Sequence, residues 1–154
     1  MILAIDFDGT LHMGQFPTIG IPMPYAIEKM KQLKADGHYI IIHTCRSNGE
    51  LLEAINWMIE KGIPFDRVND NHPDGTALHN NNSRKVYADV YVDDRQVGGL
   101  PTWPEIYEYI ASFVQPQVDR VKGHITFPYA FDYVEEQAKQ AVFLYEERKE
   151  VIHE

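Results

Sequence analysis

Three short apolar runs, each followed directly by polar side chains, constrain the fold of this chain most. The runs cover residues 1–5, 38–43 and 89–92, and the polar groups that follow them are Asp6, Thr44 and the pair Asp93 and Asp94. A run that is apolar throughout is typical of a strand covered on both faces. Each run therefore predicts a buried strand whose carboxyl end carries polar side chains.

Amphipathic stretches separate these runs. Apolar residues at spacings of three or four predict helices over residues 24–37, 48–61 and 104–114, and residues 65–68 are consistent with a short additional strand. Alternating strands and helices build a parallel sheet with helices on both faces. The expected fold is therefore a Rossmann-like, three-layer α/β/α domain.

Two stretches are rich in residues that interrupt regular structure. Residues 11–24 contain three prolines and two glycines, which predicts a loop. Residues 69–83 contain five asparagines together with Pro73 and Gly75, and we interpret them as a long surface loop. Loops of this length inside a compact domain are often functional.

The chain divides into a predicted core and a terminal extension. Residues 1–114 are expected to form the core, and residues 115–129, with two prolines and a glycine, a linker. Residues 130–154 carry an apolar stripe at helical spacing, which predicts a terminal amphipathic helix. Docking of that helix on its own domain and contact with a second copy, which would make a homo-oligomer, both stay open.

Composition disfavours several classes of function. The net charge of −9 disfavours binding to nucleic acid, since the phosphates would be repelled at long range. No stretch approaches the roughly 20 apolar residues of a membrane span. Cys45 is the single cysteine, so no intrachain disulfide can form. Together these features lead us to expect a cytoplasmic protein.

The polar residues after the strands are expected to converge, because ligands of a parallel sheet bind beyond the carboxyl ends of its strands. Asp6, Asp8, Asp93 and Asp94 would then share one edge of the sheet with Thr44. Four neighbouring carboxylates repel one another unless a cation lies among them. Ligation by oxygen alone points to Mg²⁺.

The same residues resemble the signature of the haloacid dehalogenase (HAD)-like hydrolases. Asp6-Phe7-Asp8-Gly9-Thr10 is similar to the DxDGT motif that follows the first strand of that family. Its remaining motifs, in order, are a strand ending in threonine, a basic residue and a strand ending in two acids. They correspond to residues 40–44, to Lys85 and to residues 91–94. The resemblance covers roughly residues 1–112.

The resemblance implies a role for each matching residue. Asp6 is the nucleophile that forms an aspartyl-phosphate, Asp8 is the general acid and base, Thr44 binds the phosphoryl group, and Lys85 offsets negative charge. Asp6, the backbone carbonyl of Asp8, and Asp94 in preference to Asp93 are the expected metal ligands. Gly9 and Thr10 are assigned to phosphate binding. Arg46 has two interpretations, a substrate contact or a solvated surface charge.

The function expected from these residues is Mg²⁺-dependent hydrolysis of a phosphomonoester. A phosphotransferase or phosphomutase uses the same motifs, and a non-catalytic binding module of the same fold is a further alternative. The 34 positions from Thr10 to Thr44 are expected to hold a helix and a strand, and the 41 positions from Thr44 to Lys85 a helix, a short strand and the loop, so neither gap has room for a large cap domain. Since caps usually determine specificity in this family, the phosphorylated substrate is not identified.

Overall fold

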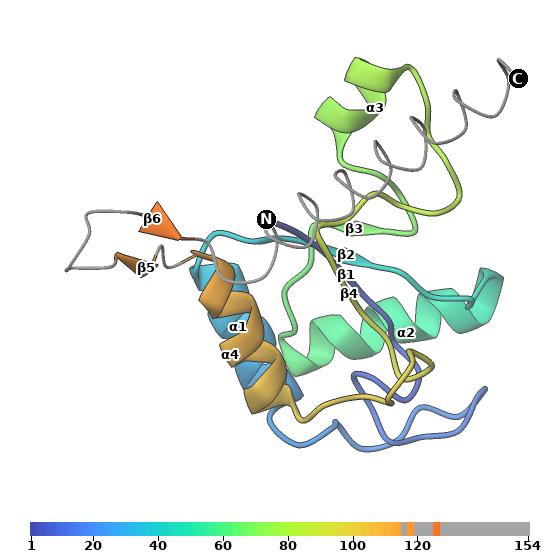
Figure 1. The fold of residues 1–154 in the computed structure, drawn as a ribbon. Coiled ribbons are helices and arrows are strands. Elements are labelled where there is room, and N and C mark those ends of the chain that lie inside the picture. The colour runs from blue at the N-terminus through green and yellow to red at the C-terminus, as the bar shows by residue number, and fades with distance from the viewer. Residues whose placement is uncertain (115–116, 119–124, 127–154) are drawn as a thin grey trace, which may run out of the picture. The chain divides into compact units, whose positions relative to one another are not determined.

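The computed structural model describes residues 1–114, 117–118 and 125–126. The chain divides into two compact units, Met1–Glu108 and Tyr109–Glu154. The first unit contains a central sheet and most of the helices (Figure 1). All the residues that form the candidate site belong to this unit.

The central sheet has four strands, all parallel. They are β1 (Ile2–Ile5), β2 (Tyr39–Ile42), β3 (Arg67–Val68) and β4 (Val90–Val92), in the order β3-β2-β1-β4. β1 lies between β2 and β4, with Ala4 opposite both Ile41 and Tyr91. The parallel α/β architecture predicted from the sequence is therefore confirmed.

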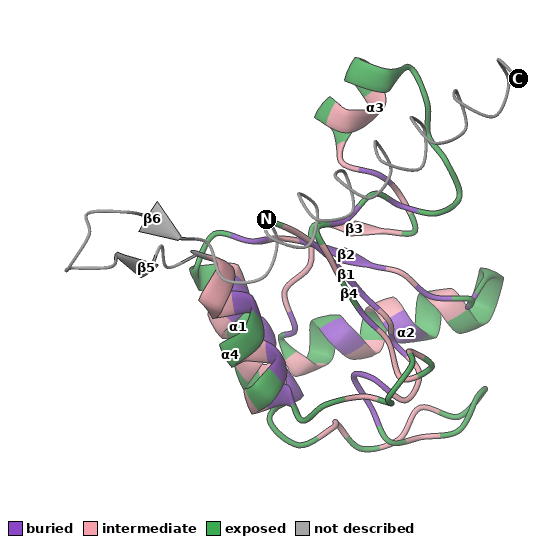
Figure 2. Cartoon of the chain, in the orientation of Figure 1, coloured by how far each residue is buried: buried purple, intermediate pink, exposed green. Residues whose placement is uncertain are grey.

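Side chains of β1 and β2 are buried on both faces of the sheet, as their uninterrupted apolar sequence predicts. Leu3, Ile5, Ile40 and Ile42 on one face are fully buried. On the other face, the cluster around Ala4 and Ile41 includes two residues of the segment before β4, Val86 and Ala88. Figure 2 shows the buried residues concentrated along the strands and on the sides of the helices that face them.

Three longer helices accompany the sheet: α1 (Ala26–Ala35), α2 (Asn48–Lys61) and α4 (Trp103–Val114). They agree with the predicted ranges to within two residues. α1 buries Ala26, Met30 and Leu33, which lie at the three- and four-residue spacing of one helical face. The first half of α4 lies beside α1 (Figure 1): the Tyr107 hydroxyl donates a 2.9 Å hydrogen bond to Asp36, the residue directly after α1.

The predicted loop at residues 69–83 contains a helix, α3 (Pro73–His79), and the loop prediction is wrong for these residues. Pro73 stands at the start of the helix, where its missing N–H costs nothing. His72 caps this end, since its Nδ1 accepts a hydrogen bond from the Asp74 backbone N–H at 3.2 Å. α3 buries none of its residues. Its sequence therefore lacks the apolar stripe by which helices are recognised.

The second unit contains β5 (Gln117–Val118) and β6 (Ile125–Thr126), which pair antiparallel. Both lie inside residues 115–129, the stretch predicted to be a linker. The terminal helix predicted for residues 130–154 lies outside the described residues. In the part of the chain that is described, no helix combines the length and apolar character needed to cross a bilayer.

Candidate active site

Three carboxylates meet where β1 and β4 end. Asp6 directly follows β1, and its backbone N–H donates a 2.9 Å hydrogen bond to the Val92 carbonyl, the last residue of β4. Asp93 and Asp94 come directly after that neighbouring strand. One oxygen from each of the three acids lies within 4.8 Å of the others. The predicted convergence of Asp6 with this acidic pair is therefore confirmed.

Asp93 and Asp94 both contribute to this cluster, although neighbouring residues of a strand face opposite sides. The reason is that β4 ends at Val92, so the alternation no longer applies to the two acids. Gly9 makes room for Asp94, because a Cβ atom at Gly9 would lie only 2.5 Å from the Asp94 Oδ2 atom. The glycine of the motif is thus required by the packing of an acid 85 residues away in the sequence.

Thr10 connects the two strand ends. Its buried hydroxyl donates to Asp6 Oδ2 at 3.2 Å and accepts from the Asp94 backbone N–H at 3.1 Å. Its carbonyl accepts a 3.0 Å hydrogen bond from the indole N–H of Trp103. The side chain of Thr10 thus holds the acidic cluster together, and the phosphate-binding role expected for Thr10 stays a prediction. Trp103, at the start of α4, was not anticipated.

The environment of Asp6 favours the protonated acid. Burial raises the pKa of Asp6 to about 7, and the negative charges of Asp93 and Asp94 act in the same direction. Hydrogen bonds from the Phe7 backbone and the Thr10 hydroxyl oppose the shift only partly. A cation among the three acids would favour the carboxylate form of Asp6 and so lower this pKa.

The Asp8 side chain points to a different set of partners. Arg46 donates to it twice, from Nε to Oδ2 at 2.8 Å and from Nη2 to Oδ1 at 2.6 Å. His12 Nε2 lies 3.2 Å from the same Oδ1 atom. The carboxylate of Asp8 is therefore engaged by two basic residues, and it is not one of the three clustered acids.

Arg46 is not a solvated surface charge, so that interpretation is wrong. Only 3% of its surface is exposed, and its guanidinium group lies close to two aromatic rings. The centroids are 5.1 Å away for Phe7 and 5.2 Å away for Phe16. Cation–π contacts of this kind partly offset the loss of hydration.

Thr44 lies at the end of β2, as predicted, and is almost fully buried. Its backbone forms two 2.8 Å hydrogen bonds with the side chain of Asn69, which follows β3. Its hydroxyl accepts a 3.2 Å hydrogen bond from the Arg46 backbone N–H. Thr44 thus fixes the start of the segment that carries Arg46, and it does not line the pocket described next.

A pocket of about 420 Å³ opens over the clustered acids. Its walls are Asp6, Asp8, Phe16, Cys45, Arg46, Asp93, Asp94 and Arg95. Phe16 and Arg95 were missed by sequence reasoning. The signal available for Arg95 was its position directly after the acidic pair, where the chain leaves the sheet edge. Phe16 lies in the 11–24 loop and carries no such signal.

Lys85 does not join the pocket walls. The residue is exposed, and its ammonium group lies 5.1 Å from the ring centroid of Tyr91. The proposed charge-offsetting role of Lys85 therefore stays a prediction, since the side chain of this surface lysine would have to reach the acids from outside the pocket walls.

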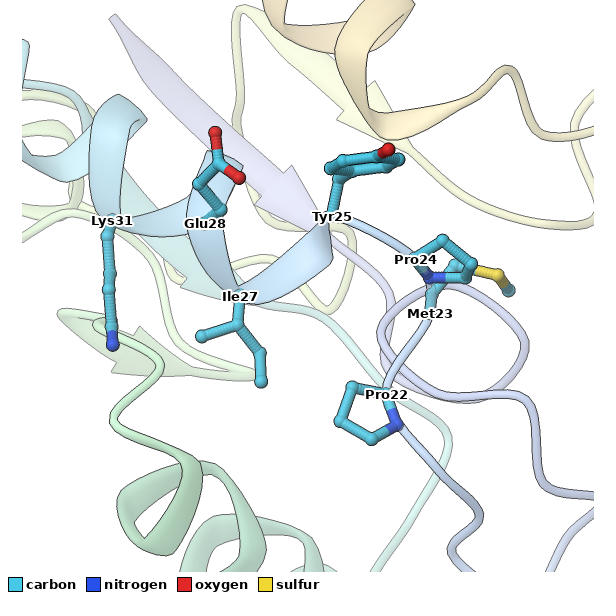
Figure 3. Close-up of a pocket in the computed structure, with 7 residues that line it drawn as sticks. All are labelled: Pro22, Met23, Pro24, Tyr25, Ile27, Glu28 and Lys31. Atoms are coloured by element: carbon cyan, nitrogen blue, oxygen red, sulfur yellow. The ribbon is translucent and has the colours of Figure 1, made fainter.

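A second hollow of about 560 Å³ lies around the start of α1 (Figure 3). Its walls come from one stretch of chain, Pro22 to Lys31, with prolines and Ile27 among them. It shares no wall residue with the acidic pocket and contains a single carboxylate, Glu28. The clustered acids therefore single out the other pocket as the candidate active site.

Comparison with known proteins yields one informative relative. No family model matches the chain, and no curated protein matches it. The solved structure of a conserved protein from Bacteroides thetaiotaomicron is similar, with 40% sequence identity and a TM-score of 0.66. The similarity covers 72% of this chain and 89% of that one. At this identity and coverage, the chain belongs to the same family as the conserved Bacteroides protein.

Proposed function

We propose that this chain is a Mg²⁺-dependent phosphohydrolase of the HAD-like type, with a three-layer α/β/α core and Asp6 as its nucleophile. The observation that carries the proposal is the meeting of Asp6, Asp93 and Asp94 within 4.8 Å, beside a pocket at the carboxyl edge of a parallel sheet. The resemblance of residues 6–10 to the DxDGT motif indicates that Asp6, among the three acids, is the nucleophile.

The three clustered acids fit the metal that the resemblance implies. They offer only carboxylate oxygens, which Mg²⁺ prefers, and the hydrogen bond from Thr10 keeps Asp6 beside the acidic pair. Gly9 leaves space for the Asp94 carboxylate that a side chain would occupy. When bound, the metal would neutralise charge on the phosphoryl group and favour attack by an anionic carboxylate.

Asp6 and Asp8 would divide the chemistry in two steps. In the first step, a bond forms between Asp6 Oδ and phosphorus, the bond from phosphorus to the leaving oxygen breaks, and Asp8, which enters this step as the protonated acid, gives its proton to that oxygen. In the second step, water attacks phosphorus, Asp8 takes its proton, and the bond to Asp6 breaks to release inorganic phosphate. Both side chains line the same pocket, as this division requires.

The pocket walls suit an anionic substrate of modest size. Arg95 lies among the wall residues with the four acids, and a bound cation would offset the charge of three of these acids, whereas the charge of Arg46 is paired with Asp8. Phe16 offers a half-exposed ring at the rim, with 58% of its surface accessible. A phosphomonoester with its phosphate over Asp6 would have its organic part near Phe16 and Cys45.

Turnover of p-nitrophenyl phosphate tests the proposal. We expect hydrolysis with Mg²⁺, none with EDTA, and a loss of several orders of magnitude for Asp6→Asn. Asp74→Asn is the matched control, because it removes one carboxylate from the exposed surface of α3 and is expected to retain full activity. Metal-independent hydrolysis, or equal activity of the Asp6→Asn variant, would refute the proposed function.

A further inference from the structure

The Asp8 carboxylate accepts three hydrogen bonds from two buried residues. Arg46 binds both of its oxygens, at 2.6 and 2.8 Å, and His12 binds one of them at 3.2 Å. Both donors are at least 97% buried, whereas 27% of the Asp8 side chain is exposed to the pocket. Two residues from distant parts of the chain thus fix the orientation of a carboxylate that faces the candidate substrate.

The 11–24 loop determines which nitrogen of His12 faces Asp8. The Nδ1 atom accepts hydrogen bonds from the backbone N–H groups of Gly14 at 2.9 Å and Gly20 at 3.3 Å. An atom that accepts two such bonds carries no proton, so the proton of the neutral ring lies on Nε2, which then donates to Asp8.

Close contact between Gly14 and Gly20 makes this arrangement possible. A Cβ atom on Gly14 would lie 2.3 Å from the Gly20 nitrogen, and one on Gly20 would lie 2.5 Å from the Gly14 nitrogen. No side chain fits at either position, so both N–H groups can reach the same Nδ1 atom only with glycine. The close approach of Gly14 and Gly20 therefore fixes the orientation of the His12 ring.

Arg46 is held in a position that structural stability alone does not explain. Its guanidinium is buried, and its Nη1 atom has no hydrogen-bond partner. Burying an arginine with an unpaired N–H carries a desolvation penalty, and replacing such pairs by apolar residues is often neutral or stabilising. The specific interactions that the buried guanidinium makes are its two hydrogen bonds to Asp8.

We propose that Arg46 and His12 are positioning residues that orient the Asp8 carboxylate toward the leaving oxygen of the substrate. This inference rests on the proposed phosphohydrolase function, in which Asp8 transfers the proton. Neither residue needs to contact the substrate for this role. Loss of either donor frees the Asp8 side chain to rotate away, and proton transfer to the leaving group then fails while attack by Asp6 continues.

Two substrates with different leaving groups separate positioning from a general structural effect. Phenyl phosphate needs a proton on its leaving oxygen, whereas dinitrophenyl phosphate departs as a stable anion. We compare kcat/KM, because it reports steps up to release of the leaving group and not the later hydrolysis of the aspartyl-phosphate. Asp8→Asn defines the expected pattern: a loss of about 100-fold or more for phenyl phosphate, and little change for dinitrophenyl phosphate.

Arg46→Met and His12→Phe should reproduce this pattern, with a loss of about 10- to 100-fold for phenyl phosphate alone. His12→Gln, which can keep a donor near the Nε2 position, should retain part of the activity toward phenyl phosphate that His12→Phe loses. Adding Arg46→Met to Asp8→Asn should cause no further loss, since both changes remove the same function. Arg95→Met is the matched control: it alters the same pocket without touching Asp8, and it should affect both substrates equally.

An equal fall for both substrates in Arg46→Met and in His12→Phe would overturn the positioning role. Inactivity of the wild-type protein toward both substrates would refute the proposed function and this role together. Nitrogen-15 NMR of His12 tests the geometry without turnover. The ring should be the neutral tautomer protonated at Nε2, with a shift that changes in Asp8→Asn, and a proton on Nδ1 would contradict the arrangement even in an active enzyme.

Discussion

Replacing Asp6 by asparagine is expected to stabilise the metal-free protein at alkaline pH, although it removes the nucleophile. The pKa of Asp6 is raised to about 7 by burial and by the charges of Asp93 and Asp94. Between about pH 4 and pH 7, the folded protein keeps a proton that the unfolded chain has lost. The free energy of unfolding therefore falls as the pH rises through this window. Asparagine is neutral at every pH in this window, so the variant avoids the free-energy cost of ionising a buried carboxyl.

The size of the effect follows from the two pKa values. The difference between the ordinary value of 3.8 and about 7 corresponds to an upper limit of about 4 kcal/mol. Because the carboxyl lines an open pocket, solvent screens part of this penalty, and we expect about 2 kcal/mol. The variant and the wild type should be equally stable below pH 4, and the full difference should be present above pH 8.

Urea unfolding in EDTA at a series of pH values measures this difference. Glu53→Gln, on the exposed surface of α2, should track the wild type at every pH. Mg²⁺ should reverse the order at pH 8, because the wild type gains binding energy that the variant has lost. An Asp6→Asn variant that is less stable than the wild type at pH 8 without metal would refute this account of the acidic cluster.

Three further changes test neighbouring features. Asp94→Ala should weaken Mg²⁺ binding, measured by calorimetry, more than Asp93→Ala does, and the reverse order would make Asp93 the principal ligand. Gly20→Ala should lower the melting temperature and shift the NMR signal of His12, whereas Gly49→Ala, where a Cβ meets open space, should leave that signal unchanged. Trp103→Phe removes the hydrogen bond to the Thr10 carbonyl and leaves a void in the core, so it should cost about 2–4 kcal/mol of stability with a reduced kcat; an unchanged kcat would show that this bond does not support the site.

The sheet and the meeting of its acids could be predicted because they depend on local patterns. The runs around Leu3 and Ile41 are apolar on both faces, which favours parallel strands, and parallel strands bring the residues that follow them to one edge. The meeting of Asp6 and Asp93 could therefore be predicted without knowledge of tertiary contacts. The same reasoning could not choose between Asp93 and Asp94, because the strand ends before either of them.

The partners of Asp8 could not be predicted, because they depend on how loops fold in three dimensions. Arg46 lies 38 positions away from Asp8, and the ring of Phe16 that covers it comes from a loop without periodicity. His12 is four positions from Asp8, but its ring is turned toward it only by the approach of Gly14 to Gly20. Side-chain contacts across irregular backbone leave no spacing pattern in the sequence.

The central claim, that Asp6 carries a phosphoryl group during turnover, can be measured directly. The wild-type protein is mixed with Mg²⁺ and dinitrophenyl phosphate, quenched in acid and digested, and the peptides are searched by mass spectrometry for an acyl phosphate. We expect phosphate on Asp6, lost on treatment with hydroxylamine and absent from Asp6→Asn. Turnover with phosphate on another residue, such as Cys45, or undiminished turnover in the Asp6→Asn variant, would contradict the account.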